Sequence, residues 1–208
     1  MIEGMETQSA KISAKEKILQ AALKVIREKG YTATAVDDLC AEAKVTKGAF
    51  FHHFKSKEDL AVKAAQFWSE ITTHVFAGAD YHKAKDPLDR LLGYIDFRKE
   101  LLRGQVPEFT CLVGTMVQEA YDSNPAIREA CRDSIFGHAL SLKDFIDDAK
   151  KLYAPQAKWS SEGLALHTQA VIQGAFILAK SQNDAEVAAE SIDHLYRYVE
   201  FLFPRLKK

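Results

Sequence analysis

Apolar residues recur at helical spacing along most of the chain, and no segment shows the alternation of a half-buried strand. The first such segment, residues 13–30, also has signals for both helix ends, because Ser13 and Glu16 form a capping box and Gly30 follows the last turn. These patterns predict an all-α fold. Further apolar stripes predict helices over residues 57–75, 87–102, 111–121, 125–153, 162–180 and 184–203, with a loop at 104–110.

Two short helices are predicted within the first sixty residues. The first spans residues 34–43 with Thr34 as its expected N-cap, and the second spans residues 47–53 with Thr46 as its expected N-cap. Only residues 44–46 separate them. Two short helices joined by such a turn form the helix-turn-helix arrangement, whose second helix enters the major groove of DNA.

Residues 44–57, KVTKGAFFHHFKSK, contain four lysines, two histidines and three phenylalanines but no carboxylate. A helix that meets DNA needs cations and free N–H groups at its N-terminal end and no acid on its outer face. Lys47 and Gly48 suit the first turn, and Phe50 and Phe54 can anchor the helix inward. A lysine run alone is typical of a solvated face. The caps, the turn, the glycine and the missing acids together favour DNA binding.

The whole chain of 208 residues has a formal net charge of −1, so affinity for nucleic acid must come from a local patch. Its three cysteines are too few and too widely spaced for a disulfide framework or a C-x-x-C metal pair, which suits a reducing cytoplasm. No signal peptide or transmembrane stretch is found, and residues 1–10 are expected to be disordered. We expect a cytoplasmic protein that makes no membrane contact.

The segment GYTATAVDDLCAEAKVTKGAFFHHFKSKEDL resembles the DNA-binding segment of the TetR (tetracycline-repressor) family of bacterial regulators, and the similarity runs from about Lys15 to Leu60. This resemblance implies a homodimeric repressor with nine or ten helices. Residues 1–57 would form the DNA-binding domain, and residues 58–208 would form a larger helical domain for ligand binding and dimerisation.

Two positions depart from the family pattern. Tyrosine is usual where this chain has Phe51, so a phosphate hydrogen bond would be replaced by van der Waals contact. Glycine is usual at Lys44, where a left-handed backbone costs a lysine about 1 kcal/mol. His53 is expected to turn toward the domain's own helices. Matched by position, the resemblance assigns DNA contacts to Thr34, Lys44, Thr46, Lys47, Gly48, Phe51, His52 and Lys57.

The resemblance also implies a ligand pocket in the C-terminal part, where aromatic residues are frequent. Such a lining would suit an apolar or aromatic effector, although each aromatic residue alone could equally fill the core. Cys111 precedes Leu112 at a helix start, and some family members with this pair are thought to sense electrophiles or oxidants; an inert buried cysteine is the alternative. No histidine pair has the spacing of a helical metal site, and no metal or cofactor is expected. The predicted lining is Phe67, Trp68, Ile71, Tyr94, Phe97, Cys111, Met116, Tyr121 and Phe136.

The predicted helix over residues 162–180 is apolar on nearly every side, which a solvent-facing helix cannot be. Together with the stripe of the last helix, it predicts a four-helix bundle between two subunits. Two reading heads would then sit about 34–36 Å apart on a palindromic site. The predicted interface is Val171, Gly174, Ala175, Leu178, Ile192, Leu195, Tyr196 and Val199.

These features predict a one-component regulator, a repressor that binds a DNA operator as a homodimer and responds to a small apolar or electrophilic effector. A helical adaptor that binds a protein partner through the C-terminal helices is the alternative. A helical enzyme is a weaker alternative, because the chain has no G-x-S-x-G, H-E-x-x-H, P-loop or G-x-G-x-x-G motif.

Overall fold

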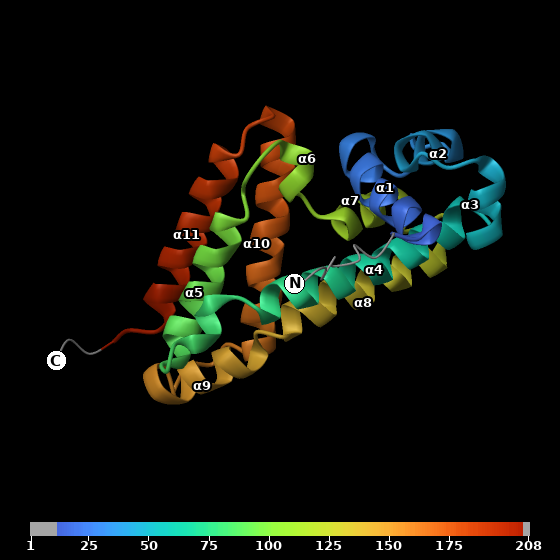
Figure 1. Cartoon of the computed structure of the whole chain (residues 1–208). Helices are drawn as coiled ribbons and strands as arrows, with labels where there is room; N and C mark the ends of the chain where they lie inside the picture. The colour runs from blue at the N-terminus through green and yellow to red at the C-terminus, as the bar shows by residue number, and fades with distance from the viewer. Residues whose placement is uncertain (1–11, 206–208) are drawn as a thin grey trace, which may run out of the picture.

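The computed structural model describes residues 12–205, so the predicted disorder of residues 1–10 lies outside the described residues. Within this range every α-helix and 3-10 helix belongs to one all-helical body, and no strand occurs (Figure 1). The all-α prediction is therefore confirmed. The described chain has eleven α-helices, but α6 has only four residues, which leaves ten longer helices.

The helices follow one another with short connections. Their bounds are α1 Ala14–Lys29, α2 Val36–Ala43, α3 Lys47–His53, α4 Lys57–Ala77, η1 Asp80–Lys83, α5 Pro87–Glu100, α6 Val106–Phe109, α7 Leu112–Ala120, α8 Pro125–Leu140, α9 Lys143–Tyr153, α10 Ser161–Gln182 and α11 Glu186–Leu202.

The head consists of α1, α2, α3 and the start of α4, and it lies at one end of the molecule (Figure 1). Its caps form as the sequence predicts, since the Ser13, Thr46 and Ser56 hydroxyls accept from backbone N–H groups three residues later. The apolar side chains of the head share one core with α7 and α8, to which Leu112, Met116 and others contribute. The head therefore rests on the body through a continuous apolar core.

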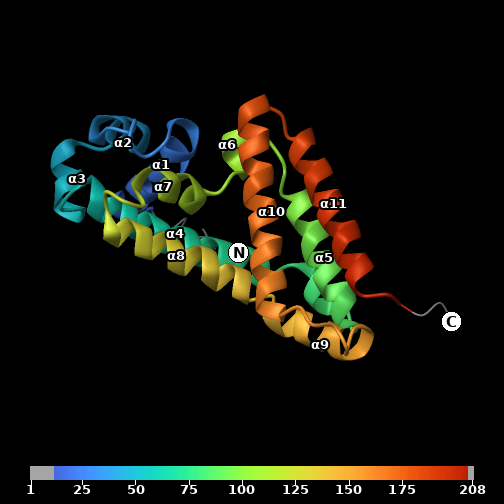
Figure 2. The same cartoon turned by 180° about the vertical axis from the view of Figure 1, so that it is seen from behind.

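The body joins two groups of helices. Helices α4 and α8 lie side by side and connect the head to the far end, where α5, α9, α10 and α11 form a second core (Figures 1 and 2). No helix among residues 12–205 has both the length and the apolar character that crossing a bilayer requires.

Three helix predictions need correction. The predicted helix 125–153 is broken at Ser141 and Leu142, where the Ser141 hydroxyl donates to the carbonyl of His138 and Leu142 is buried. This break turns α9 toward α5, and one straight helix could not reach it. The predicted loop 104–110 contains α6. Helix α2 starts two residues later than expected, because Asp38 caps the free N–H of Ala35.

Candidate functional site

The turn between α2 and α3 takes the conformation that its sequence requires. Lys44 has φ 55° and ψ 47°, in the left-handed region where glycine is favoured, and its N–H donates to Ala41 O. Thr46 then caps α3 by accepting from Ala49 N at 3.2 Å. This geometry ends α2 and starts α3 within three residues.

Helix α3 has one buried face and one solvent face. Phe50 is fully buried and its ring packs against that of Phe54, so these two side chains hold the helix on the head. Phe51 on the other face is 55% exposed, and His52 is exposed beside it. Lys47 is exposed as well, although its Nζ lies 2.7 Å from Asp37 Oδ1 of α2. A surface ion pair of this kind contributes little to stability and can exchange for a phosphate.

Two residues assigned to DNA contacts form hydrogen bonds within the head. Thr34 is 1% exposed and its hydroxyl donates to Gly30 O at 2.6 Å, so this side chain cannot reach a phosphate. Lys57 donates to Tyr31 O and Thr34 O and stacks over the Tyr31 ring. The assignment of a direct phosphate contact to the buried Thr34 is therefore wrong in this conformation, whereas that of the half-buried Lys57 stays a prediction. Both residues order the loop between α1 and α2.

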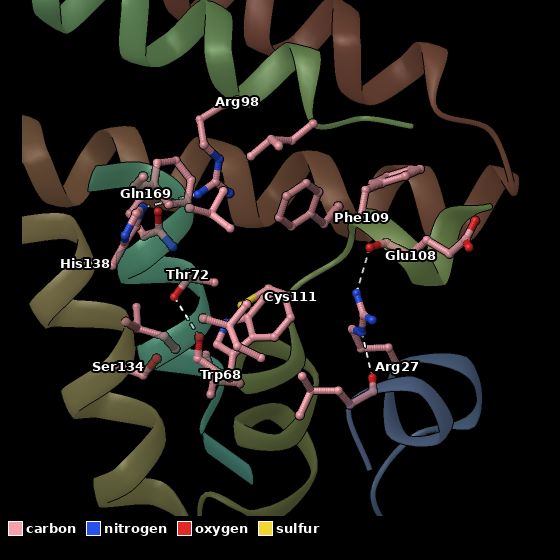
Figure 3. A pocket seen from close by; sticks show the side chains of 18 of the residues that line it. Arg27, Trp68, Thr72, Arg98, Glu108, Phe109, Cys111, Ser134, His138 and Gln169 are labelled. Carbon is pink, nitrogen blue, oxygen red and sulfur yellow. Dashed lines mark hydrogen bonds between the residues drawn. The ribbon is translucent and has the colours of Figure 1, made fainter. Parts of the chain in front are cut away.

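A cavity of about 340 Å³ lies where α1, α4, α5, α8 and α10 meet, next to the α6–α7 connection (Figure 3). Trp68, Ile71 and Cys111 from the predicted set line it. A second cavity, of about 280 Å³, shares Phe76 and His138 with it on the other side. The volume of the first cavity is in the range of small-molecule sites.

The remaining predicted lining residues lie elsewhere, so six of the assignments need correction. Tyr94 and Met116 are fully buried core residues. Phe67 packs against the core of the head, and Phe97 packs behind Phe76 at a ring distance of 5.4 Å. Each of these side chains fills a core. The other two, Tyr121 and Phe136, are exposed on the outer surface.

The structure adds polar residues to the cavity that the sequence analysis missed. Arg98 of α5, His138 of α8 and Gln169 of α10 converge on one end of it, as Figure 3 shows. Burial and the Arg98 charge lower the pKa of His138 to about 3, so its imidazole is neutral. In the sequence these residues are isolated polar positions on helices, and no local pattern connects them. Phe76, Phe109 and Phe176 complete the aromatic wall.

Cys111 caps α7 through its thiol, which accepts from Gly114 N at 3.4 Å, and it is half-buried at the cavity wall. Burial raises the pKa of the other two thiols, to about 12 for Cys131, so these stay protonated. All three cysteines are free. Among the described residues, no three His, Cys, Asp or Glu side chains gather where they could hold a metal ion.

The head contacts the cavity directly. Leu23 and Arg27 of α1 line it, and Arg27 donates to the backbone oxygen of Glu108 on α6 at 2.7 Å (Figure 3). A second link is made by Glu119 of α7, whose carboxylate accepts from Tyr31 N and Thr32 N at 3.2 and 2.7 Å. Helix α1 therefore belongs to both the head and the cavity wall, and α7 is bonded to the loop that follows α1.

The predicted dimer surface on α10 and α11 has to be redrawn. Ala175, Ile192, Leu195 and Val199 are buried within the chain, so they cannot meet a second subunit. Val171 and Tyr196 are partly buried against the same core. Both helices are amphipathic within the subunit, which the nearly uniform apolar sequence concealed. The exposed large apolar residues of the two helices are Ile177, Leu178, Tyr198 and Phe201, and we name them, together with the half-buried Gly174, the outer face.

Residues 18–64 match the sequence profile described as "Bacterial regulatory proteins, tetR family". The HTH-type transcriptional repressor DhaR of Mycobacterium sp. (strain GP1) is 29% identical over 57% of this chain and 58% of that protein. The transcriptional regulator AcuR of Cereibacter sphaeroides is 28% identical over 51% of this chain and 48% of that protein. This chain spans 28% of the length of the regulator YerO of Bacillus subtilis, to which it is 32% identical over 44% of its own length.

Solved structures cover more of the chain. A TetR-family regulator from Agrobacterium tumefaciens has a TM-score of 0.78 at 19% identity and covers 92% of this chain and 98% of its own. The reduced form of E. coli NemR has a TM-score of 0.73 at 20% identity, with the same coverage. At this identity the likeness shows the fold. YerO, AcuR, DhaR and the Agrobacterium tumefaciens protein are all described as transcriptional regulators. The profile match places residues 18–64, the helix-turn-helix segment, in the TetR family of bacterial regulatory proteins, and the described chain has the fold of solved TetR-family regulators.

Proposed function

We propose that this protein is a one-component transcriptional regulator that binds duplex DNA through the exposed tip of α3. The observation that carries the proposal is the composition of this tip. Lys44, Lys47, Gly48, Phe51 and His52 are all exposed, and no acid occurs between residues 44 and 57. A helix N-terminus with cations and no carboxylate favours contact with phosphates, which leaves the next side chains free to reach base edges.

The outer face supports a homodimer. Phe201 is 82% exposed, and Tyr198 on the same helix and Ile177 and Leu178 on α10 are exposed as well. Exposed large apolar side chains on two adjacent helices favour a protein interface. A Cβ added to Gly174 would meet no atom within 4 Å, so a helix of a second subunit can approach closely there. A two-fold pair would carry two α3 helices and would read a palindromic operator in the cytoplasm.

The cavity supports a response to a small-molecule effector. Leu23 and Arg27 belong both to its wall and to α1, so a ligand that separates α1 from α4 or α7 would move the head. In a repressor this movement would change the spacing of the two α3 helices and release the operator. The half-buried Cys111 thiol at the wall leaves an electrophilic effector as a variant of this proposal.

The experiment that tests DNA binding uses a gel shift on sequences selected from a random duplex library. Lys47→Ala and His52→Ala should each abolish retention without lowering the melting temperature, since both side chains are exposed. Lys83→Ala is the matched control, because Lys83 is an equally exposed lysine on η1, paired with Asp80. This control should bind DNA as the wild type does.

Salt dependence separates this proposal from a helical adaptor. Contacts with phosphates release counterions, so the logarithm of the association constant should fall linearly with the logarithm of salt concentration, and the slope should be shallower in Lys47→Ala. If the protein retained no selected duplex even at low salt, or if both variants bound like the wild type, the proposed function would be wrong.

A further inference from the structure

Arg98 carries a buried positive charge into the cavity. Arg98 as a whole is 8% exposed. Its guanidinium carbon lies 5.3 Å from the ring centre of Phe76 and 5.6 Å from that of Phe176. No carboxylate within residues 12–205 lies within 4.0 Å of the Arg98 guanidinium. The other cation at this cavity, Arg27, donates hydrogen bonds to two backbone carbonyls. Arginine stays protonated in proteins, and a buried charge normally has a counter-charge.

The hydrogen bonds of Arg98 leave most of its donors free. Its described partners are His138, whose Nε2 lies 3.3 Å from a guanidinium nitrogen, and the Tyr94 hydroxyl, which lies 2.9 Å from the same Nε2. Since the His138 imidazole is neutral, Nε2 can accept from both groups with the ring proton on Nδ1. Neither partner supplies negative charge, so the guanidinium has no counter-charge among the described residues.

Gln169 adds a second unsatisfied group at the same end of the cavity. It is 6% exposed, and its Oε1 is buried without a hydrogen-bond donor. In Figure 3, Gln169 and His138 lie together below the Arg98 guanidinium. A buried amide oxygen without a donor is costly, so it favours a ligand that provides an O–H or N–H group. The rest of the lining is mostly apolar, with Trp68 and Phe109 in it, and it also includes Arg27 and Glu108.

We propose that the cavity binds an amphipathic monocarboxylate. The carboxylate pairs with Arg98, an aromatic or aliphatic body packs against the apolar walls, and a hydroxyl or amino group of the ligand donates to Gln169 Oε1. One negative charge on the ligand matches the one guanidinium that lacks a counter-charge, whereas a phosphate dianion would leave excess charge in an apolar site. This inference rests on the proposed function, because it names the chemical class of the effector.

A purely structural role for Arg98 is the competing explanation. A guanidinium stacked on two aromatic rings contributes to packing whether or not a ligand binds. That role predicts no preference between an acid and its neutral analogue, so the experiment must compare molecules that differ only in this charge.

The experiment is isothermal titration calorimetry on the full chain without DNA. The probes are four acid and amide pairs with identical bodies: phenylacetate, 4-phenylbutyrate, 2-naphthoate and octanoate, each against its primary amide. At least one acid should bind about tenfold or more tightly than its amide, as expected for charge-assisted hydrogen bonds. Arg98→Met should abolish this preference, and Arg98→Lys should retain part of it.

A second comparison concerns Gln169. Mandelate differs from phenylacetate by one hydroxyl, and one enantiomer should bind more tightly than phenylacetate to the wild type. Gln169→Leu should remove this advantage but leave the preference for acid over amide unchanged. A hydroxyl advantage that persists in Gln169→Leu would remove Gln169 from the proposal.

Three results would overturn the carboxylate assignment: no acid in the panel binds, acid and amide bind equally, or Arg98→Met keeps the preference. If Arg98→Met does not fold, the wild-type comparison and Arg98→Lys still decide. Because the calorimetry contains no DNA, its failure leaves the DNA-binding proposal standing. Conversely, a failed gel shift leaves the measured acid preference unaffected.

Discussion

Among residues 12–205, Gly48 has no neighbour that would exclude a side chain at this position. A Cβ built there would meet only Thr46 Oγ1, at 3.8 Å, which is ordinary contact. Gly48→Ala should therefore raise the free energy of unfolding by up to about 1 kcal/mol, because alanine is the better helix former. If the α3 backbone approaches DNA closely, the same change should weaken operator binding at least tenfold. Chemical denaturation and gel shift measure the two effects.

Gly137→Ala on α8 is the matched control, since a Cβ there meets nothing within 4 Å and the position lies outside the head. It should gain similar stability without loss of DNA affinity. Undiminished binding by Gly48→Ala would contradict a close approach of α3 to the duplex.

His138 should make stability depend on pH. Its pKa is about 3 in the folded chain and 6.5 when unperturbed, so between these values the unfolded chain binds a proton that the folded chain does not. Stability is therefore fully present above pH 6.5 and falls as the pH drops toward 3, with up to about 2 kcal/mol lost by pH 5. Denaturation of the wild type and of His138→Gln at pH 7 and 5 measures this loss. Parallel pH profiles for the two proteins would contradict it.

Residue roles were predictable where one local rule decides them. The Thr46 cap and the left-handed turn at Lys44 follow from the turn pattern between two short helices. The bonds of Thr34 and Lys57 within the head were not predictable, because their partners, Gly30 O and the carbonyls of residues 31–34, become neighbours only when α1, α2 and α4 pack. A position matched to a family does not reveal such intramolecular bonds.

At the scale of helices, periodicity located almost every element. It missed the break at Ser141, because Ser141 and Leu142 are compatible with a continuing helix and only packing on α5 requires the turn. It also could not distinguish a core from a cavity. Ile71 and Val75 continue the apolar stripe of α4, yet they face the cavity rather than a packed neighbour. The convergence of Arg98, His138 and Gln169 from three helices left no trace in the sequence.

The link between α7 and the head can be tested at Glu119. Glu119→Gln keeps one acceptor oxygen and loses the charge, so one of the two bonds to Tyr31 N and Thr32 N should be lost, at about 1 kcal/mol. Amide hydrogen exchange at Tyr31 and Thr32 should accelerate about fivefold, which NMR measures residue by residue. The control is Glu100→Gln, which makes the same carboxylate-to-amide change at an exposed position on α5. It should leave the exchange rates of the Tyr31 and Thr32 amides unchanged. Equal exchange in Glu119→Gln and the wild type would exclude this link.

For the whole molecule, the outer face predicts the mode of assembly. Phe201→Glu places a charge on the most exposed large apolar residue of α11, so it should weaken the proposed dimer at least tenfold without unfolding the subunit. Sedimentation velocity at several concentrations measures the shift from dimer to monomer. Phe136→Glu on α8 is the control, since Phe136 is also exposed but lies outside the outer face. A Phe201→Glu protein that stays dimeric, or a wild type that is monomeric throughout, would contradict the proposed interface.

The core that the head shares with α7 and α8 limits how the protein can be re-engineered. Side chains such as Leu112 and Ile127, far along the chain, complete the packing of α1 and α4. A chimera that grafts residues 1–57 onto another sensor would expose this apolar surface and would aggregate or melt early. A chimera that includes α7 and α8 as well as the head would keep this core intact. It would also carry over the part of the cavity wall that α7 and α8 form.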